Sequence, residues 1–167
     1  MPRPLIVTAA TEGSPYEACL EIQREIHGDN IHTVLFSERS WAEGTKIKPK
    51  AIMEALQIRD TVLWIDADCT VDLPDTEPPE GEVLTTENIH PHHINRISAA
   101  FILFRRHKST ENFLRSWAIA NHRHRKDHAA LMQTIRRMEV QVRIRDMTEW
   151  LRGRHTINSL LPERGVF

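Results

Sequence analysis

The sequence predicts an α/β protein with a central, mostly parallel sheet flanked by helices. The segment 61–65 (Thr-Val-Leu-Trp-Ile) is a short apolar run, which is typical of a central parallel strand buried on both faces. Two strand–helix units precede it, and this alternation indicates a parallel sheet with covering helices. A length of 167 residues with 40% hydrophobic residues suits one domain with a substantial core.

The first unit is a strand over 5–9 followed by a helix that begins near Ser14. Ser14 can cap this helix, Pro15 suits its first position, and Glu17 completes a capping box. Gly28 can end it, because glycine readily adopts the left-handed conformation of a C-terminal cap.

The second unit is a strand over 33–36 and a helix over 49–58 with apolar residues at helical spacing. After the central strand, Pro74, Pro78, Pro79 and Gly81 indicate a loop. The remaining elements follow from apolar patterning and helix-start residues. They are a strand over 83–86, a strand over 98–104, a helix capped by Ser109 or Thr110, a helix beginning at Asp127, a strand over 140–144 and an irregular tail over 152–167.

Asp66-Ala67-Asp68 directly follows the central strand and is the most informative motif. Ligands of such sheets bind beyond the carboxyl ends of the strands. Two carboxylates so close together are unfavourable unless a cation compensates them. Hard oxygen ligands suit a divalent cation that is also bound by phosphate oxygens. The motif therefore predicts a metal and a phosphorylated ligand, although solvated carboxylates at a strand end are the alternative.

Composition excludes several classes of protein. No apolar run approaches the roughly 20 residues that cross a bilayer, and the N-terminus does not have the form of a signal peptide. Two cysteines, Cys19 and Cys69, do not make a disulfide framework, so we expect a cytoplasmic protein.

Charge is distributed unevenly along the chain. Residues 1–100 carry 8 Lys and Arg against 17 Asp and Glu, whereas residues 101–167 carry 14 against 6. This asymmetry indicates either an anionic partner for the C-terminal part or neutralisation between the halves across the fold.

An ordered set of segments resembles glycosyltransferases of the GT-A fold. Many members have a Lys-Pro pair that opens the helix before an apolar strand, and that strand ends in an Asp-x-Asp metal motif. Lys48-Pro49 and Asp66-Ala67-Asp68 match that pattern. Further matches are Thr8, Thr11 and 15–17 for the first strand and nucleotide loop, 98–101 for a small-residue strand, and 127–131 for a late Asp-Gln-x-x-Leu helix start, with His128 in place of Gln. The likeness spans about residues 5–155. It implies a catalytic domain over 1–155 followed by a tail over 156–167.

The resemblance implies a nucleoside-diphosphate sugar as donor, expected to be a UDP-sugar, with Mn²⁺ or Mg²⁺ between its phosphates. Asp68 resembles the direct metal ligand, and Asp66 resembles the Asp that faces the nucleoside directly or through the metal. His155 is the candidate for a third ligand. Lys48 and a late arginine, Arg152 or Arg154, would offset phosphate charge. Thr8 and Thr11 would also bind the nucleotide.

Asp127 is the candidate for a carboxylate that faces the acceptor, where an inverting enzyme would use it to deprotonate a hydroxyl. A helix-start carboxylate favoured by the helix dipole is the alternative. Compact enzymes that resemble this chain occur in bacteriophages and glycosylate hydroxymethylated pyrimidines, so DNA is one acceptor to consider. A homodimer is a further expectation.

Two other functions remain open from the sequence. Asp66-x-Asp68-x-Thr70-Val71 fits the nucleophile motif of haloacid dehalogenase-type phosphatases. That motif normally lies near the N-terminus, whereas two strand–helix units precede it here. The basic runs 105–108 and 122–126 could instead belong to a non-catalytic nucleic-acid-binding module, although aromatic interleaving is sparse.

Overall fold

The computed structural model describes residues 3–37, 44–87, 97–124, 126–157 and 159–161. A six-stranded sheet forms the centre of the molecule, with its strands in the order β2-β1-β3-β6-β5-β7. The strands are β1 (Leu5–Thr11), β2 (Ile31–Phe36), β3 (Thr61–Ile65), β5 (Val83–Glu87), β6 (Ile97–Arg105) and β7 (Ile144–Asp146). The pairs β1–β2, β1–β3 and β5–β7 are parallel, and β6 runs antiparallel to both β3 and β5. The predicted mostly parallel sheet with flanking helices, in a single domain, is thus confirmed.

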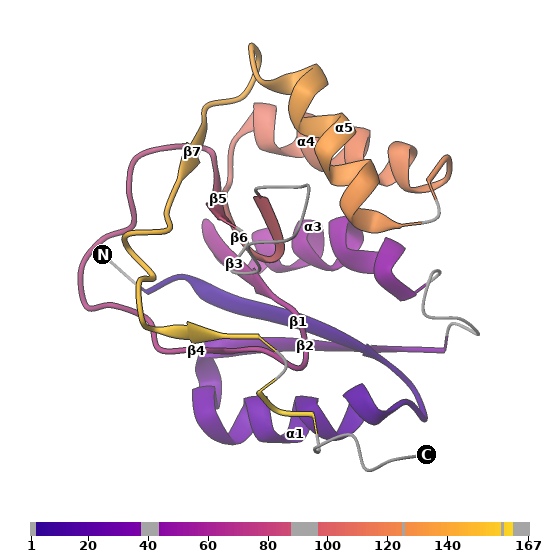
Figure 1. Ribbon diagram of the computed structural model, residues 1–167, viewed down its shortest axis with the longest axis vertical. Coiled ribbons are helices and arrows are strands. Elements are labelled where there is room, and N and C mark those ends of the chain that lie inside the picture. Colours follow the sequence, from indigo (N-terminus) through magenta and orange to yellow (C-terminus); the bar gives the residue numbers. More distant parts are fainter. Residues whose placement is uncertain (1–2, 38–43, 88–96, 125, 158, 162–167) are drawn as a thin grey trace.

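Helices cover both faces of the sheet (Figure 1). The helix α1 (Pro15–His27) packs on one face. The helices α3 (Lys48–Ile58), α4 (Lys108–Asn121) and α5 (Asp127–Met138) pack on the other. Short 3-10 turns, η1 (Gly28–Asn30) and η2 (Thr45–Ile47), lead into β2 and α3. No helix in the described part of the chain is long and apolar enough to span a membrane.

Alternating residues of the central strands enter two separate cores. Val62 and Trp64 of β3 pack towards α3, α4 and α5, whereas Leu63 and Ile65 pack on the opposite face. All four are almost fully buried, as the apolar run predicted. The strand therefore holds its carboxyl end, and the Asp66-Ala67-Asp68 segment that follows, between two packed layers.

Two predicted helix starts differ in their capping contacts. The Ser14 hydroxyl donates to the Thr11 carbonyl instead of capping α1, and Glu17 accepts from the backbone N–H of Gly13. The helix still begins at Pro15 and ends at His27. Gly28 is its C-terminal cap, and the positive φ of 55° at this position suits glycine. At α4 the cap is His107, not Ser109 or Thr110, because its Nδ1 accepts from the Ser109 N–H.

The predicted last strand over 140–144 is wrong. Residues after α5 form a turn in which the N–H groups of Gln141 and Val142 reach the Met138 carbonyl, and Val140 is 93% exposed. The alternation of apolar residues indicated a strand here, but Val142 packs beneath α5 and does not join the sheet. Strand β7 starts only at Ile144.

The expected irregular tail contains a short strand. Strand β8 (His155–Thr156) pairs antiparallel with β4 (Thr70–Val71), directly after the carboxylate motif. The Thr70 and Thr156 hydroxyls also form a hydrogen bond with each other. The boundary expected at residue 155 therefore falls inside a strand, and the C-terminal segment packs against the turn that follows β3.

Candidate functional site

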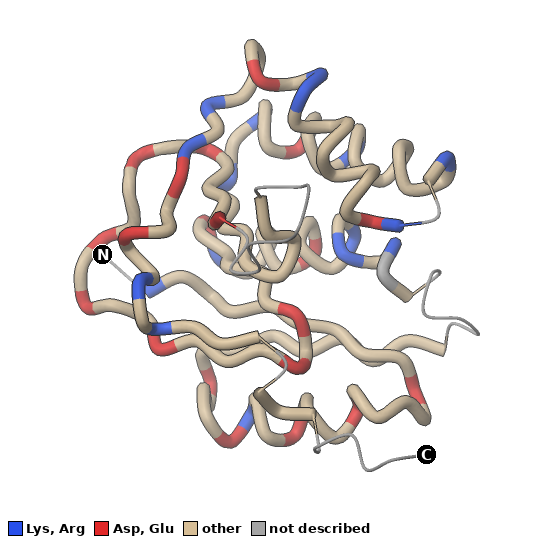
Figure 2. The backbone as a smooth tube through the Cα atoms, viewed as in Figure 1, with Lys and Arg blue, Asp and Glu red and all other residues tan. Residues whose placement is uncertain are grey.

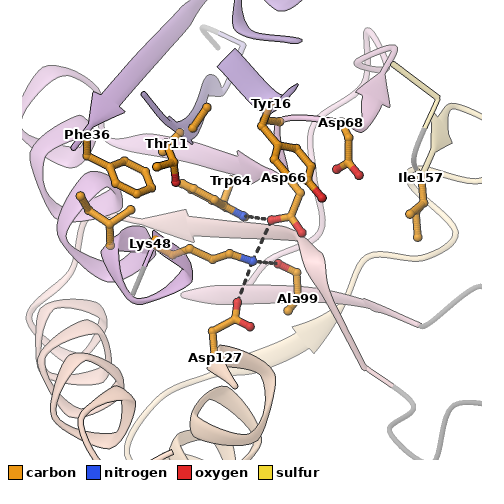
Figure 3. Close-up of a pocket in the computed structure, with 15 residues that line it drawn as sticks. Thr11, Tyr16, Phe36, Lys48, Trp64, Asp66, Asp68, Ala99, Asp127 and Ile157 are labelled. Atoms are coloured by element: carbon orange, nitrogen blue, oxygen red, sulfur yellow. Dashed lines mark hydrogen bonds and ion pairs between the residues drawn. The ribbon is translucent and has the colours of Figure 1, made fainter. Parts of the chain in front are cut away.

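A pocket of about 270 Å³ opens at the carboxyl ends of β1 and β3 (Figure 3). Its position is the one expected for a ligand site in an α/β sheet. Four charged side chains line it, together with small and aromatic residues. The lining consists of Ala9, Ala10, Thr11, Tyr16, Phe36, Gly44, Ile47, Lys48, Trp64, Asp66, Ala67, Asp68, Ala99, Asp127 and Ile157.

Lys48 is held between two carboxylates. Its Nζ lies 2.7 Å from Asp66 Oδ1 and 2.8 Å from Asp127 Oδ2, and it donates to the Ala99 carbonyl at 3.4 Å. The Lys48 side chain is only 7% exposed. Burial alone would lower the pKa of Lys48, but the carboxylates of Asp127 and Asp66 more than offset this, so its pKa lies above the ordinary value. The residue therefore stays an ammonium.

Trp64 adds a second constraint on Asp66. Its indole Nε1 donates to Asp66 Oδ1 at 2.9 Å, and Lys48 Nζ lies 5.4 Å from the centre of its ring, in cation–π range. Both the tryptophan and the lysine therefore use the same carboxylate oxygen. The ion pair and hydrogen bond fix the side chain of Asp66 from the direction of the α3–α5 layer (Figure 3).

Asp127 lies at the first position of α5, where the helix dipole favours a carboxylate. Its Oδ1 accepts from the His128 N–H at 2.8 Å, while Oδ2 faces Lys48. His128 Nε2 in turn contacts the Ile97 carbonyl of β6 at 2.8 Å, which anchors this helix start to the sheet. The ammonium of Lys48, on α3, thus joins Asp66 at the end of β3 to Asp127 of α5, although the three residues are distant in the sequence.

Asp68 is directed towards a different part of the pocket, away from Lys48 and on the side where Ile157 lies (Figure 3). It lies in a tight turn in which the Cys69 N–H donates to the Asp66 carbonyl at 3.0 Å. Burial, and then the negative charge of Asp66, raise the pKa of the Asp68 carboxyl. A nearby cation would stabilise the ionised form of this carboxylate.

The pocket carries excess negative charge. When all are ionised, the three carboxylates of Asp66, Asp68 and Asp127 outnumber the single ammonium of Lys48, leaving two uncompensated negative charges among the described lining residues. Asp66 and Asp68 offer oxygen ligands of the kind that Mg²⁺ and Mn²⁺ prefer. In charge and in ligand type, the site therefore fits a divalent cation.

Four predicted site residues lie outside this lining, and one of them, Arg152, pairs with Glu149. Thr8 is fully buried within β1, and its hydroxyl has no hydrogen-bond partner among the described residues. Arg154 forms an ion pair of 3.1 Å with Asp72. His155 Nδ1 donates to the Leu151 carbonyl at 2.8 Å, and its ring packs edge-on against Phe101. Within the described ranges, no three His, Cys, Asp or Glu side chains gather to hold a metal, so His155 does not join Asp66 and Asp68 there.

Two walls of the pocket, the aromatic ring of Phe36 and the backbone of Gly44, are not indicated by the sequence. Phe36 ends the edge strand β2, and Gly44 begins the segment that leads into α3. A Cβ placed on Gly44 would lie 2.9 Å from both the Phe36 ring and Thr11 Oγ1. No local sequence signal could reveal this approach, because it depends on the packing of two segments across the sheet edge.

Replacing Gly44 with alanine should lower the free energy of unfolding by about 1–3 kcal/mol through overpacking. The added methyl group would press on Phe36 and Thr11, so one of the pocket side chains has to move. Urea unfolding measures the loss. The double variant Phe36→Leu/Gly44→Ala removes ring atoms next to the methyl group and should recover part of it, whereas an unchanged unfolding midpoint in Gly44→Ala would contradict the close approach.

The fold is similar to that of glycosyltransferases of known structure. A glycosyltransferase involved in the glycosylation of the major capsid of PBCV-1 aligns with a TM-score of 0.60 and 14% identity, over 87% of this chain and 82% of that chain. The glycosyltransferase GlyE of Streptococcus pneumoniae TIGR4 aligns with a TM-score of 0.49 and 10% identity, over 88% of this chain and 46% of that one. No protein-family model matches the sequence, and no curated protein matches it either. The first likeness shows a shared fold.

Proposed function

We propose that the protein is a metal-dependent glycosyltransferase that moves a sugar from a nucleoside-diphosphate sugar to a hydroxyl acceptor. The observation that carries the proposal is the excess of two negative charges in a pocket at the carboxyl ends of the strands. A diphosphate would add further negative charge there, so its binding requires a cation. The fold shared with a glycosyltransferase supports the choice of reaction.

Asp68 and Asp66 are the residues that would hold the cation, Mn²⁺ or Mg²⁺, with phosphate and water oxygens completing its ligands. When bound, the ion would act as a Lewis acid that stabilises the leaving nucleoside diphosphate. Lys48 and Trp64 would keep Asp66 in one orientation, since both contact its Oδ1. Because the ammonium of Lys48 is already paired with two carboxylates, we assign Lys48 to positioning Asp66 and Asp127 in preference to binding phosphate.

The nucleoside would lie against the aromatic side of the pocket. Tyr16 and Phe36 line it near Thr11, and flat rings suit the face of a nucleobase. Thr11 can supply a hydroxyl for hydrogen bonding. We propose a UDP-sugar as the donor. Thr8 and Arg154, the other residues expected to bind the nucleotide, would have to act from outside the lining described above.

The acceptor would approach Asp127, which would remove the proton from its hydroxyl in an inverting reaction. A hydroxymethylated base in DNA remains one form of this acceptor. Part of the positive charge of the C-terminal half is already paired within the molecule: Arg106 pairs with Asp60, Arg143 with Glu82, and Arg154 with Asp72. Basic (blue) and acidic (red) positions are accordingly mixed over the folded backbone in Figure 2, although they are unevenly distributed along the sequence. These pairs support neutralisation between the halves and weaken the case for a purely nucleic-acid-binding module.

The phosphatase alternative gains less support from the site. Its first aspartate would have to attack phosphorus through Oδ2, because Lys48 and Trp64 both contact Asp66 Oδ1. The carboxylate motif also follows the third strand of the sheet along the chain, within a fold that a glycosyltransferase shares. We therefore keep glycosyl transfer as the single proposed reaction.

Thermal unfolding with UDP-, GDP- and CDP-sugars, each with and without Mn²⁺, tests the proposal. A donor at 100 times its Kd should stabilise the native state by about 2.7 kcal/mol, which corresponds to a Tm rise of roughly 5–10 °C. We expect this rise with a UDP-sugar and only when Mn²⁺ is present, because the pocket otherwise repels the diphosphate.

Asp68→Asn is the matched variant, since it keeps the size of the side chain and removes one negative charge from the pocket. It should abolish the metal-dependent part of the Tm rise. If no nucleotide sugar stabilises the protein in a metal-dependent way, or if Asp68→Asn responds like the wild type, the proposed function is wrong.

A further inference from the structure

Gln23 is a fully buried polar residue of α1 that the catalytic proposal does not use. Its side-chain Nε2 donates to two backbone carbonyls beyond β3, that of Ala67 at 3.3 Å and that of Cys69. Its Oε1 is buried and has no hydrogen-bond partner among the described residues. The amide is therefore held in the core through its donor contacts, which both reach the carboxylate turn.

The two carbonyls lie immediately before and after Asp68 in the chain. A buried carbonyl that loses its partner is costly, so each such contact restrains the peptide unit that it joins. The other carbonyls of the turn are satisfied as well: that of Asp66 accepts from the Cys69 N–H, and that of Asp68 accepts from the Leu160 N–H at 3.1 Å. Gln23 thus supplies the donor for two of these four carbonyls, and it does so from a separate helix.

Side-chain packing joins the same two elements. Ala67 packs with Cys19 and Leu20 of α1 in a small core of its own, next to Leu160. Ala67 therefore contacts α1, while all three residues of the motif line the pocket. The helix holds the middle residue of the motif by apolar contact and its backbone by the Gln23 amide.

We propose that Gln23 is a positioning residue, which holds the Asp66-Ala67-Asp68 turn in the conformation that binds the metal. This inference rests on the proposed function, because it assigns the turn a metal. Groups that orient metal ligands from outside the ligand set commonly affect metal affinity by 10–100-fold. Gln23 would do so through the backbone on both sides of Asp68, without contacting the ion.

Two variants separate the amide from the volume of the side chain. Gln23→Met keeps the length and removes both donors, while Gln23→Asn keeps the amide but is one methylene shorter and cannot reach both carbonyls. Mn²⁺ binding to each purified protein is measured by electron paramagnetic resonance of free Mn²⁺, at a temperature where circular dichroism shows the protein to be folded. We expect a Kd for Mn²⁺ that is 10-fold or more higher in both variants.

A structural control has to lose stability without touching the turn. Leu114→Ala serves this purpose, because Leu114 is a fully buried residue of α4, in the core on the other face of the sheet. It should lower the Tm and leave the Kd for Mn²⁺ within twofold of the wild type. If the Gln23 variants also keep the wild-type Kd, Gln23 is only a structural residue and the inference fails. If the wild type itself binds no Mn²⁺, the proposed metal dependence fails instead.

A measurement on the wild type covers the case in which neither Gln23 variant folds. The side-chain amide protons of Gln23 should exchange slowly with solvent, and their resonances should shift when the diamagnetic ion Mg²⁺ is added. Resonances that stay unchanged at saturating Mg²⁺, while those of the Asp68 backbone move, would show that the amide does not sense the metal site and would overturn the inference.

Discussion

Replacing Lys48 with methionine should lower the free energy of unfolding by about 3–5 kcal/mol, the usual cost of removing one partner from a buried ion pair. Methionine fills much of the same volume but leaves the carboxylates of Asp66 and Asp127 without their shared cation. The Asp127 side chain is 8% exposed, so little solvent can take the place of the ammonium. For a protein of this length the Tm should fall by roughly 6–20 °C, measured by calorimetry or circular dichroism.

Lys50→Met is the matched control, since it makes the same change two residues further along α3. The Lys50 side chain is 71% exposed, and its nearest carboxylate oxygen, on Glu54, lies 4.0 Å away. Such surface pairs contribute at most about 1 kcal/mol, so the Tm should hardly change. The double variant Lys48→Met/Asp127→Asn removes one of the orphaned charges and should recover part of the lost stability. If Lys48→Met unfolds at the same temperature as Lys50→Met, the buried ion pairs do not stabilise this fold.

The features that were predicted correctly depend on residues close together in the chain. The apolar segment that becomes β3 and the two aspartates that follow it are contiguous, so their placement at the end of a buried strand follows from local pattern alone. Pro49 near the start of α3 marks the helix in the same way. The resemblance to a family motif predicts that Lys48 offsets phosphate charge; the structure places it in the pocket, paired with two carboxylates, and its part in phosphate binding stays a prediction.

The features that were missed depend on contacts between distant segments. Gln23 lies 44 residues before Ala67, and nothing in the sequence around it indicates that this polar side chain faces the core. Phe36 and Gly44 meet only because an edge strand and the start of α3 pack together. The joint pairing of Asp66 and Asp127 with Lys48 likewise requires α5 to dock beside β6, which no local pattern specifies.

The shared lysine changes how Asp127 should be regarded. A carboxylate that pairs with an ammonium at 2.8 Å, and accepts an N–H on its other oxygen, is held firmly in place. Such restraint suits a general base, because the geometry of proton transfer has to be set before reaction. Lys48 also links Asp127 to Asp66, and therefore the proposed acceptor side of the pocket to the proposed donor side.

Replacing Asp127 with asparagine should reduce sugar transfer by about 10²–10⁴-fold, the usual contribution of a general base. Asparagine keeps the shape of the side chain, and its Oδ1 can still accept the His128 N–H. Lys48 keeps Asp66 and the Ala99 carbonyl as partners, so the pocket should persist. Release of UDP from UDP-sugars measures the rate, with water and with an oligonucleotide containing hydroxymethylated bases as acceptors.

The division between kcat and KM decides the role of Asp127. A base acts only in the transition state, so kcat should fall while the KM for the donor and its Mn²⁺-dependent Tm rise stay near the wild-type values. Asp60→Asn is the control, because Asp60 is an exposed carboxylate paired with Arg106 and should be dispensable for transfer. If Asp127→Asn loses donor binding, Asp127 is a donor-site or structural residue. Lys48 would then need both carboxylates to hold Asp66 in place. Undiminished transfer would place the base elsewhere in the pocket.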